Sequence, residues 1–327
     1  MAVYVNTNYS ALQGQRYLGN VQNQLTTTYQ RLSSGMRINS AKDDAAGLQI
    51  ADRLTSQING LNQGNRNASD GIALAQTMEA GMDEVSGMLQ KIRTLAVQAN
   101  NGTNTAEDRT AISKEMSSLA TEINRIAMKT TFAGKTILNG HTDKGSIFGD
   151  KAAGAPAPPA PAPGGGLNGA EGTMTLQVGS NKGDTISFKM TSIMFSVVGA
   201  AAGDLINAAN THIFKTAADG SITVDLNKAQ AGNNKTIGDV INLMDSMIAI
   251  VDGKRADLGA IQNRLESSIR NQSNVAANEA DARSRIRDAD FAEESANLSQ
   301  QSIIQQAAAS MLMQANTRPQ LGLSLLG

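Results

Sequence analysis

The sequence has no cysteine and no tryptophan, and only 3% of its 327 residues are aromatic. The absence of cysteine excludes disulfide bonds, thiolate catalysis and zinc or iron–sulfur sites with cysteine ligands. Its two histidines, His141 and His212, stand apart from any HExxH motif or carboxylate cluster. We therefore expect no enzyme activity, no cofactor and no metal, and we assign no catalytic, cofactor-binding or metal-binding residue.

Charge is also scarce. Lys and Arg number 28 and Asp and Glu number 29, which leaves a net charge of −1. No dense basic run could follow a phosphate backbone, so nucleic acid is not an expected partner. No stretch approaches the roughly 18 apolar residues of a membrane span, and the first ten residues lack the regions of a cleaved secretory signal. We expect no membrane insertion, and export by an uncleaved route.

The apolar residues that are present are mostly Leu, Ile, Val, Met and Ala, which suit helix seams. Several sets recur at alternating intervals of three and four residues, or once every seven, as in coiled coils. They are Ala75, Met78, Met82, Val85, Leu89, Ile92 and Ala96; Ile112, Met116, Leu119, Ile123 and Ile126; and Met244, Val251, Leu258 and Leu265. This spacing predicts three long helices that pack along their lengths.

The two ends of the chain carry further stripes and few charges. We expect the first and last segments to pair and to self-associate, because neutral polar faces are desolvated at lower cost than charged ones. A weakly charged rod that stays monomeric is equally compatible with the composition alone. The candidate assembly residues are Leu18, Val21, Leu25, Leu32, Ile304, Met311, Leu312, Leu325 and Leu326.

Local signals predict where helices begin and end. Capping boxes of the Ser/Thr-x-x-Asp type occur at residues 40–43, 105–108 and 236–239. Gly35 is placed for a left-handed cap, and a helix is expected from about Ser40 to Asn100. The apolar stripe loses phase at residues 62–67, which predicts a bend or a change of neighbour there.

The middle of the chain has a different composition. Five of the six prolines lie in residues 155–163, ahead of three glycines, which indicates a linker or exposed loop. Residues 174–178 and 185–190 flank a turn-like segment and predict a β-hairpin, and a second strand pair is possible around residues 221–225. The predicted fold class is mainly α: a long antiparallel helical bundle or coiled coil formed by the two ends of the chain, with a small β-hairpin region in the middle.

Several segments resemble bacterial flagellins. They are residues 31–47 (RLSSGMRINSAKDDAAG), 67–71 (NASDG), 89–98 (LQKIRTLAVQ), 100–103 (NNGT), 283–291 (RSRIRDADF) and 323–326 (LSLL). The resemblance implies nested layers. Residues 1–42 and 288–327 would form a terminal coiled coil in the inner filament layer, and residues 43–138, 172–190 and 232–287 a helical rod with a β-hairpin in the second layer. Residues 139–171 would be a Pro/Gly-rich insert, and 191–231 a small variable region.

The resemblance also implies a function. The chain would be a structural subunit that self-assembles into the extracellular flagellar filament for motility. It would be secreted by type III export, with a flagellar export chaperone and the filament cap as further partners. Flagellins are sensed by a vertebrate Toll-like receptor, and the matching positions here are Lys91, Leu95 and Glu115. Family members usually carry Arg where Lys91 stands, and Arg and Lys differ in bidentate hydrogen bonding.

Three other functions account for parts of the sequence. A hook–filament junction protein shares the terminal helices but not the full motifs at residues 31–47 and 283–291. A protease within the variable middle would need a motif such as HExxH or Gly-x-Ser-x-Gly, and residues 139–235 contain neither. A generic secreted coiled-coil scaffold accounts for the seams but not for the charge-poor, amphipathic ends.

Overall fold

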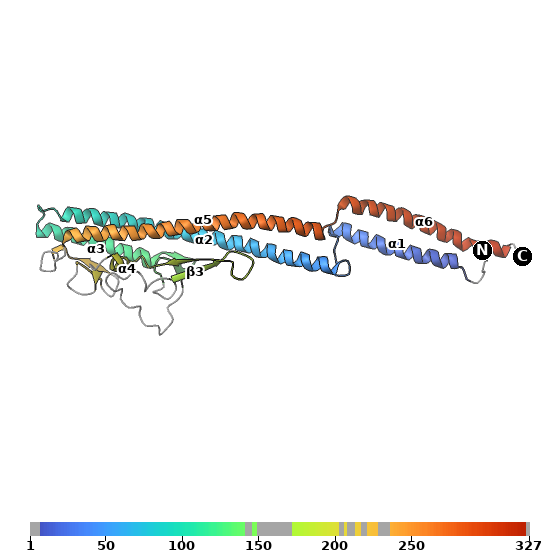
Figure 1. Cartoon of the computed structure of the whole chain (residues 1–327), viewed down its shortest axis with the longest axis horizontal. Helices are drawn as coiled ribbons and strands as arrows, with labels where there is room; N and C mark the ends of the chain where they lie inside the picture. Colours follow the sequence, from blue (N-terminus) through green and yellow to red (C-terminus); the bar gives the residue numbers. More distant parts are fainter. Residues whose placement is uncertain are drawn as a thin grey trace, which may run out of the picture. The chain divides into compact units, whose positions relative to one another are not determined.

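The computed structural model describes residues 7–140, 146–148, 172–202, 206–207, 213–216, 221–227 and 236–324. The helices are α1 (Tyr9–Ser34), α2 (Ala45–Ala99), α3 (Ala106–Lys129), α4 (Phe195–Ala202), α5 (Ile237–Arg287) and α6 (Phe291–Ser324) (Figure 1). The strands are β1 (Thr131–Phe132), β2 (Lys135–Thr136), β3 (Gly172–Gln177), β4 (Thr185–Met190), β5 (Ile206–Asn207), β6 (Phe214–Thr216) and β7 (Ile222–Val224). The predicted mainly α fold with a small β region in the middle is confirmed.

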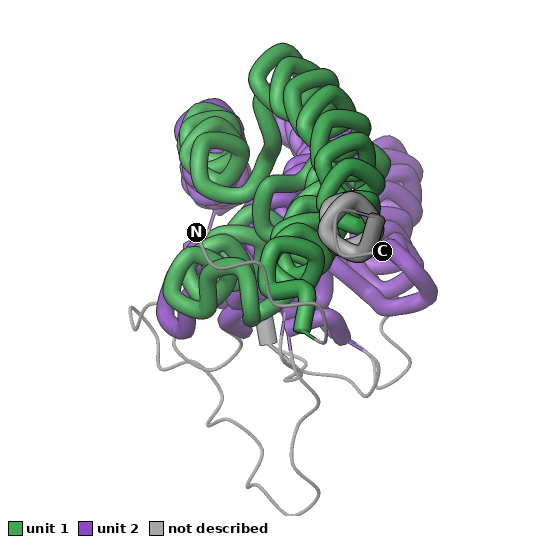
Figure 2. Tube along the Cα trace, turned by 90° about the vertical axis from the view of Figure 1, so that its right-hand side faces the viewer, with its two compact units in different colours: residues 1–59, 274–327 green, residues 60–273 purple. Residues whose placement is uncertain are grey.

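The chain divides into two compact units, coloured separately in Figure 2. Unit 1 comprises residues 1–59 and 274–327, and unit 2 comprises residues 60–273. The helices α2 and α5 contribute residues to both.

In unit 1, α1 and α6 lie side by side, as the stripes at the two ends predicted (Figure 1). The Asn8 side chain caps the start of α1 by accepting the Ala11 N–H at 3.1 Å. The helix ends at Gly35, whose φ of 70° is left-handed and whose N–H donates to the Arg31 carbonyl. The predicted left-handed cap at Gly35 is therefore confirmed.

The connection after α1 is tied by its backbone to the connection between α5 and α6. The N–H groups of Arg37 and Ile38 donate to the Arg287 carbonyl at 2.7 and 3.3 Å, and the Ala289 N–H donates to the Gly35 carbonyl at 3.0 Å. The Ile38 side chain is buried beside these bonds. This corner is built from residues of the two segments that carry the strongest resemblance, 31–47 and 283–291.

The long helix α2 begins at Ala45, five residues later than expected. Only the carboxylate half of the predicted capping box is present: Asp43 Oδ2 accepts the N–H groups of Ser40 and Asn39 at 2.9 and 3.1 Å, and the Ser40 hydroxyl also donates to this oxygen. That contact closes a turn outside the helix. Asp44 caps α2 instead, with Oδ1 accepting the Gly47 N–H at 2.9 Å.

Unit 2 contains a continuous apolar core in which the predicted seams of α2, α3 and α5 meet. Met78, Met82, Leu89, Met116 and Leu265 are fully buried in it. The capping box of Thr105 and Asp108 starts α3, as predicted, and the bond from the Thr236 N–H to Asp239 precedes α5.

The predicted hairpin is formed by β3 and β4, which pair antiparallel from Gly172↔Met190 to Gln177↔Thr185. It packs on glycines of α2: a Cβ added at Gly64 would lie 2.1 Å from the Val178 carbonyl oxygen, and one at Gly71 would lie 2.4 Å from Leu176. The helix is continuous through residues 62–67. The loss of phase there coincides with a new neighbour, since the hairpin packs on this stretch of α2.

A second, smaller sheet has the strand order β5-β6-β7, and its antiparallel β6–β7 pair is the second strand pair expected near residues 221–225. The strand β7 lies along α3, where hydroxyl groups accept its N–H groups. The pairs are Ile222 with Thr121 at 3.2 Å, Val224 with Ser117 at 2.8 Å, and Leu226 with Ser113 at 3.3 Å. The proline-rich segment, His141 and His212 lie outside the described residues.

Candidate functional site

Large apolar side chains that remain exposed are concentrated in unit 1. Of the eleven found among the described residues, ten belong to this unit and only Val97 belongs to unit 2. Tyr9, Ile303 and Met313 are 67–73% exposed. The ten are Tyr9, Leu12, Tyr17, Tyr29, Ile50, Val275, Phe291, Ile303, Met311 and Met313. These residues come from α1, α2, α5 and α6, and we call the whole set, wherever its members lie on the unit, the apolar face of unit 1.

The predicted assembly residues divide between two surfaces of the α1–α6 pair. Val21 is buried, and Leu18, Leu25, Leu32, Ile304 and Leu312 are partly buried. Met311 is 61% exposed and belongs to the apolar face. Leu325 and Leu326 lie outside the described residues. Much of the predicted stripe is therefore covered within the chain, while an outward face remains.

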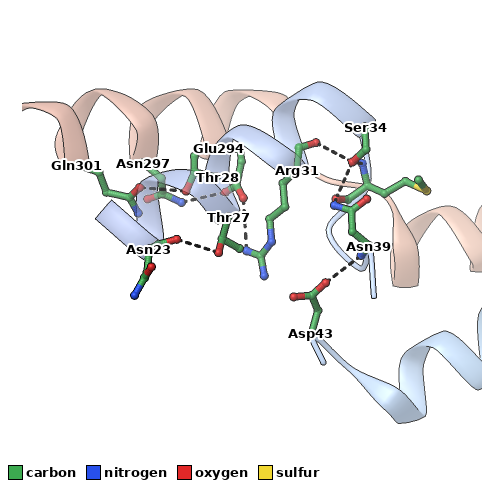
Figure 3. A network of polar contacts seen from close by, with 11 residues as sticks. Asn23, Thr27, Thr28, Arg31, Ser34, Asn39, Asp43, Glu294, Asn297 and Gln301 are labelled. Carbon is green, nitrogen blue, oxygen red and sulfur yellow. Dashed lines mark hydrogen bonds and ion pairs between the residues drawn. The ribbon is translucent and has the colours of Figure 1, made fainter. Parts of the chain in front are cut away.

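Polar contacts set the register of α1 against α6 (Figure 3). The Thr28 hydroxyl donates to Gln301 Oε1 at 3.1 Å, and Arg31 Nη1 lies 3.4 Å from Glu294 Oε1. The Glu294 side chain is buried and also accepts an N–H of Asn297 at 3.3 Å. Hydrogen bonds to a buried carboxylate fix geometry, because losing one partner leaves a charge uncompensated.

An open groove of about 510 Å³ lies between α1 and α6. Gly14 and Tyr17 line it from α1, and Ala308, Met311 and Ala315 line it from α6. The helices are close here: a Cβ added at Gly14 would lie 3.0 Å from the Leu312 side chain. The groove is continuous with the apolar face through Tyr17 and Met311.

The corner beside this pair carries a perturbed carboxyl, Asp43 (Figure 3). The backbone N–H groups of Ser40 first, then of Asn39, hold the pKa of Asp43 below its ordinary value. The physical cause is that these donors stabilise the ionised carboxylate. The arrangement is a structural clamp, and it offers no nucleophile or acid–base pair.

The three residues matched to receptor recognition lie in unit 2. Lys91 Nζ and Glu115 Oε1 are 3.2 Å apart, and both side chains are about half exposed. Leu95 is only 9% exposed and belongs to the core cluster. The structure thus brings Lys91 and Glu115 together on the surface and places Leu95 beneath it.

Sequence reasoning missed several members of the apolar face, including Leu12, Phe291 and Met313. All three are apolar residues of α1 or α6 that do not belong to the seam between these helices. The signal that could have identified them is an apolar residue at a helix position outside the apolar stripe of that helix.

Within the described ranges, no group of three or more His, Asp or Glu side chains is arranged to hold a metal ion.

Among the described helices, none is both long and apolar enough to cross a membrane.

Both helical ends of the chain match known protein-family regions. Residues 5–143 match the bacterial flagellin N-terminal helical region, and residues 241–326 match the bacterial flagellin C-terminal helical region. The chain is 39% identical to Flagellin D of Vibrio anguillarum and 37% identical to Flagellin B of Vibrio cholerae serotype O1, in each case over the full length of both chains.

Two solved structures are similar. The putative flagellar hook-associated protein from Vibrio parahaemolyticus has a TM-score of 0.51 at 16% identity, covering 75% of this chain and all of that one, which shows a shared fold. The Bacillus cereus flagellin is 25% identical with a TM-score of 0.38, covering 65% of this chain and 94% of that one. The two matched regions supply α1, α2, α3, α5 and α6, and the chain therefore belongs to the bacterial flagellin family of filament structural proteins.

Proposed function

We propose that this chain polymerises into an extracellular flagellar filament that serves motility, with the apolar face of unit 1 buried between copies. The observation that carries the proposal is the distribution of exposed apolar side chains, ten of eleven in unit 1. Large apolar side chains left exposed in such numbers on one part of a protein mark an interaction site. The large apolar core cluster lies wholly in unit 2. Unit 1 is therefore the part that would bury the most additional apolar surface by binding other copies.

The free energy of apolar burial favours association through the same residues. Burial of apolar area contributes roughly 25 cal/mol per Å², so a few hundred Å² per contact is substantial when it is repeated in every subunit. Two different surfaces that meet head to tail generate an open helical polymer instead of a closed ring. The α1–α6 pair offers the open groove and, outside its lining, other exposed apolar side chains such as Tyr9 and Met313.

Polymerisation in a precipitating salt, followed by negative-stain electron microscopy, tests the proposal. Met311→Gln removes an apolar side chain that is 61% exposed, and Met311→Leu retains one. We expect the wild type and Met311→Leu to form long tubes, and Met311→Gln to form them at a several-fold higher protein concentration or not at all. All three should have the same helical circular dichroism. Tubes from Met311→Gln at the wild-type concentration would contradict the proposed interface.

The end of the chain gives a second test. A chain lacking residues 318–327 keeps all of unit 2. We expect it to lose polymerisation while the thermal unfolding of unit 2 is unchanged. Normal tubes from this truncated chain would show that the end of α6 takes no part in assembly.

The same assay separates the filament subunit from a hook–filament junction protein. We infer that long tubes form from this chain alone, whereas a junction protein acts between two other polymers and has no need to polymerise by itself. Persistent monomers or short rings would favour the junction function.

We also propose the exposed Lys91–Glu115 pair as part of a surface recognised by the flagellin-sensing Toll-like receptor. The two charges lie together on unit 2. Receptor-expressing cells treated with the purified chain should respond, and Glu115→Gln should weaken the response. Lys114→Gln alters the neighbouring exposed residue and serves as the matched control. An unchanged response to Glu115→Gln would remove this residue from the surface.

A further inference from the structure

The dipeptide Asn-Gly occurs four times in the chain, at residues 59–60, 101–102, 139–140 and 168–169. In this dipeptide the backbone nitrogen of Gly can attack the carboxamide carbon of Asn, because Gly has no side chain to obstruct the approach. Three of the four lie in described parts of the chain, in three different environments. The environment, and not the shared sequence, sets how readily each reacts.

The site at Asn101 is open. Asn101 and Gly102 are exposed and lie in the turn between α2 and α3. The Asn101 carbonyl accepts the Asn104 N–H at 3.2 Å, whereas no hydrogen bond from the Gly102 N–H occurs in this described turn. The Asn101 side-chain oxygen makes a long 3.5 Å contact with the Thr103 N–H. This contact folds the carboxamide over the intervening Gly102 peptide unit.

The other two described sites are protected. Asn59 and Gly60 lie inside α2, where the glycine N–H is part of the helical hydrogen-bond ladder and the backbone cannot rotate without breaking it. Asn139 is only 1% exposed, and its side-chain oxygen accepts the Ser192 hydroxyl at 3.4 Å. Reaction at either site requires local unfolding first.

We propose that Asn101 is a site of spontaneous deamidation in the folded chain. The Gly102 nitrogen loses its proton to solvent and forms a bond to Asn101 Cγ, and ammonia leaves. The resulting cyclic imide adds one water molecule and opens at either carbonyl, which gives aspartate or isoaspartate at position 101. The reaction consumes water and releases ammonia, with no oxidant, enzyme or cofactor.

The product changes the turn in two ways. It adds one negative charge directly after the C-terminal end of α2, where a negative charge is unfavourable. Isoaspartate also lengthens the backbone by one carbon. Because every copy reacts at the same rate after it folds, the fraction modified records the age of the protein.

Peptide mapping of the full-length chain tests the proposal. Trypsin releases Asn59, Asn101 and Asn139 in separate peptides, residues 54–66, 94–109 and 136–144. The native protein is incubated at mildly alkaline pH and sampled over time. The deamidated fraction found in a digest of unincubated protein is subtracted from each measurement. We expect Asn101 to deamidate at least about tenfold faster than Asn59 and Asn139, since an exposed turn opens at almost no cost and a helix interior does not. Tandem mass spectrometry separates Asn101 from Asn100 and Asn104.

Two controls make the result decisive. In denaturant the three sites should react at similar rates, because their environments are then equal. Gly102→Ala should fold normally, since no heavy atom lies within 4 Å of the added Cβ and the backbone is not left-handed, and it should slow the native reaction by about tenfold through obstruction of the attacking nitrogen. Equal native rates at the three sites, or an Asn101 that reacts only in denaturant, would overturn the proposal.

Discussion

Two exposed aspartates, Asp43 and Asp108, accept backbone N–H groups that have no helical partner. Asp43 takes those of Ser40 and Asn39, and Asp108 takes that of Thr105. Hydrogen bonds to the ionised form lower a carboxyl pKa. The Thr105 backbone N–H, followed by its hydroxyl, lowers the pKa of Asp108 below its ordinary 3.8.

The Asp108 interaction predicts a pH dependence of the stability of unit 2. Because the pKa of Asp108 is lower in the folded state, its contribution is fully present above the ordinary 3.8 and is lost as the pH falls through the folded value. Thermal unfolding should therefore show a smaller loss of stability on acidification for Asp108→Asn than for the wild type. Glu107→Gln, in the same first turn, should behave like the wild type. An equal loss in Asp108→Asn and wild type would contradict the prediction.

Caps that depend on adjacent residues were predictable from the sequence. Thr105 and Gly35 are examples, because each satisfies the backbone of its own helix end. The start of α2 was not predictable in the same way. Asp43 and Asp44 are both able to cap, and Asp44 does so while residues 37 and 38 are held by the distant Arg287 carbonyl. The segment before α2 is thus held by a contact with a residue far away in the sequence, which local spacing does not reveal.

At the scale of secondary-structure elements, three glycines of α2, Gly60, Gly64 and Gly71, mark where the β3–β4 hairpin and its turn pack. A glycine inside a helix costs about 1 kcal/mol relative to alanine, so each requires a reason. Gly64 has one: no Cβ fits against the Val178 carbonyl. Gly87 has open space around its Cβ position.

Alanine substitutions at these two positions should have opposite effects. Gly64→Ala should destabilise unit 2 by about 1–3 kcal/mol, because overpacking outweighs the gain in helix propensity. Gly87→Ala should stabilise it by up to about 1 kcal/mol. Denaturant unfolding of the two variants measures the difference. Stabilisation by Gly64→Ala would show that the hairpin does not pack closely on α2 in solution.

The hydroxyls of α3 and the strand β7 match in spacing. Four helical residues rise about 6 Å, and two strand residues rise about 6.6 Å, so hydroxyls at every fourth helix position meet alternate N–H groups of the strand. Each hydroxyl also donates to a carbonyl of its own helix, at 2.7–2.8 Å. The edge of β7 is thereby closed to other strands.

Removal of one such hydroxyl should loosen the small sheet. Ser117→Ala leaves the Val224 N–H without its acceptor and should destabilise unit 2 by about 1–3 kcal/mol, since an unpaired buried donor retains its desolvation cost. Ser118→Ala removes a hydroxyl that bonds only within α3 and is the matched control. Hydrogen exchange at Val224 should accelerate in the first variant alone. Unchanged exchange there would exclude Ser117 as the acceptor in solution.

At the scale of the whole molecule, the two units differ in how much apolar surface they cover. The seams of α2, α3 and α5 were predictable because their spacing is regular and the partners lie within one core. The outward apolar face of unit 1 was only partly predictable. The α1 stripe contributes the buried Val21, whereas the partner stripe on α6 leaves Met311 exposed, and spacing alone does not separate the two cases.

This difference predicts how hydrogen exchange responds to assembly. In the unassembled chain, amides of α1 and α6 should exchange at least about a hundredfold faster than core amides of α2 and α3, because fewer buried apolar contacts oppose local opening. On polymerisation the α1 and α6 amides should become protected, while core amides around Met82 and Met116 change little. Exchange in α1 and α6 that is already slow before assembly, or fast after it, would contradict the proposed interface.

The bond from Asn8 to the Ala315 carbonyl joins residues 307 positions apart. Closing a loop of that length is entropically costly, and contacts so distant in sequence form slowly. A chain that emerges from its N-terminal end has α1 available early but lacks the helix that α1 packs against until the last residues arrive. The surface on which we propose that copies join is therefore completed last, so a partly emerged subunit has no finished interface with which to aggregate prematurely.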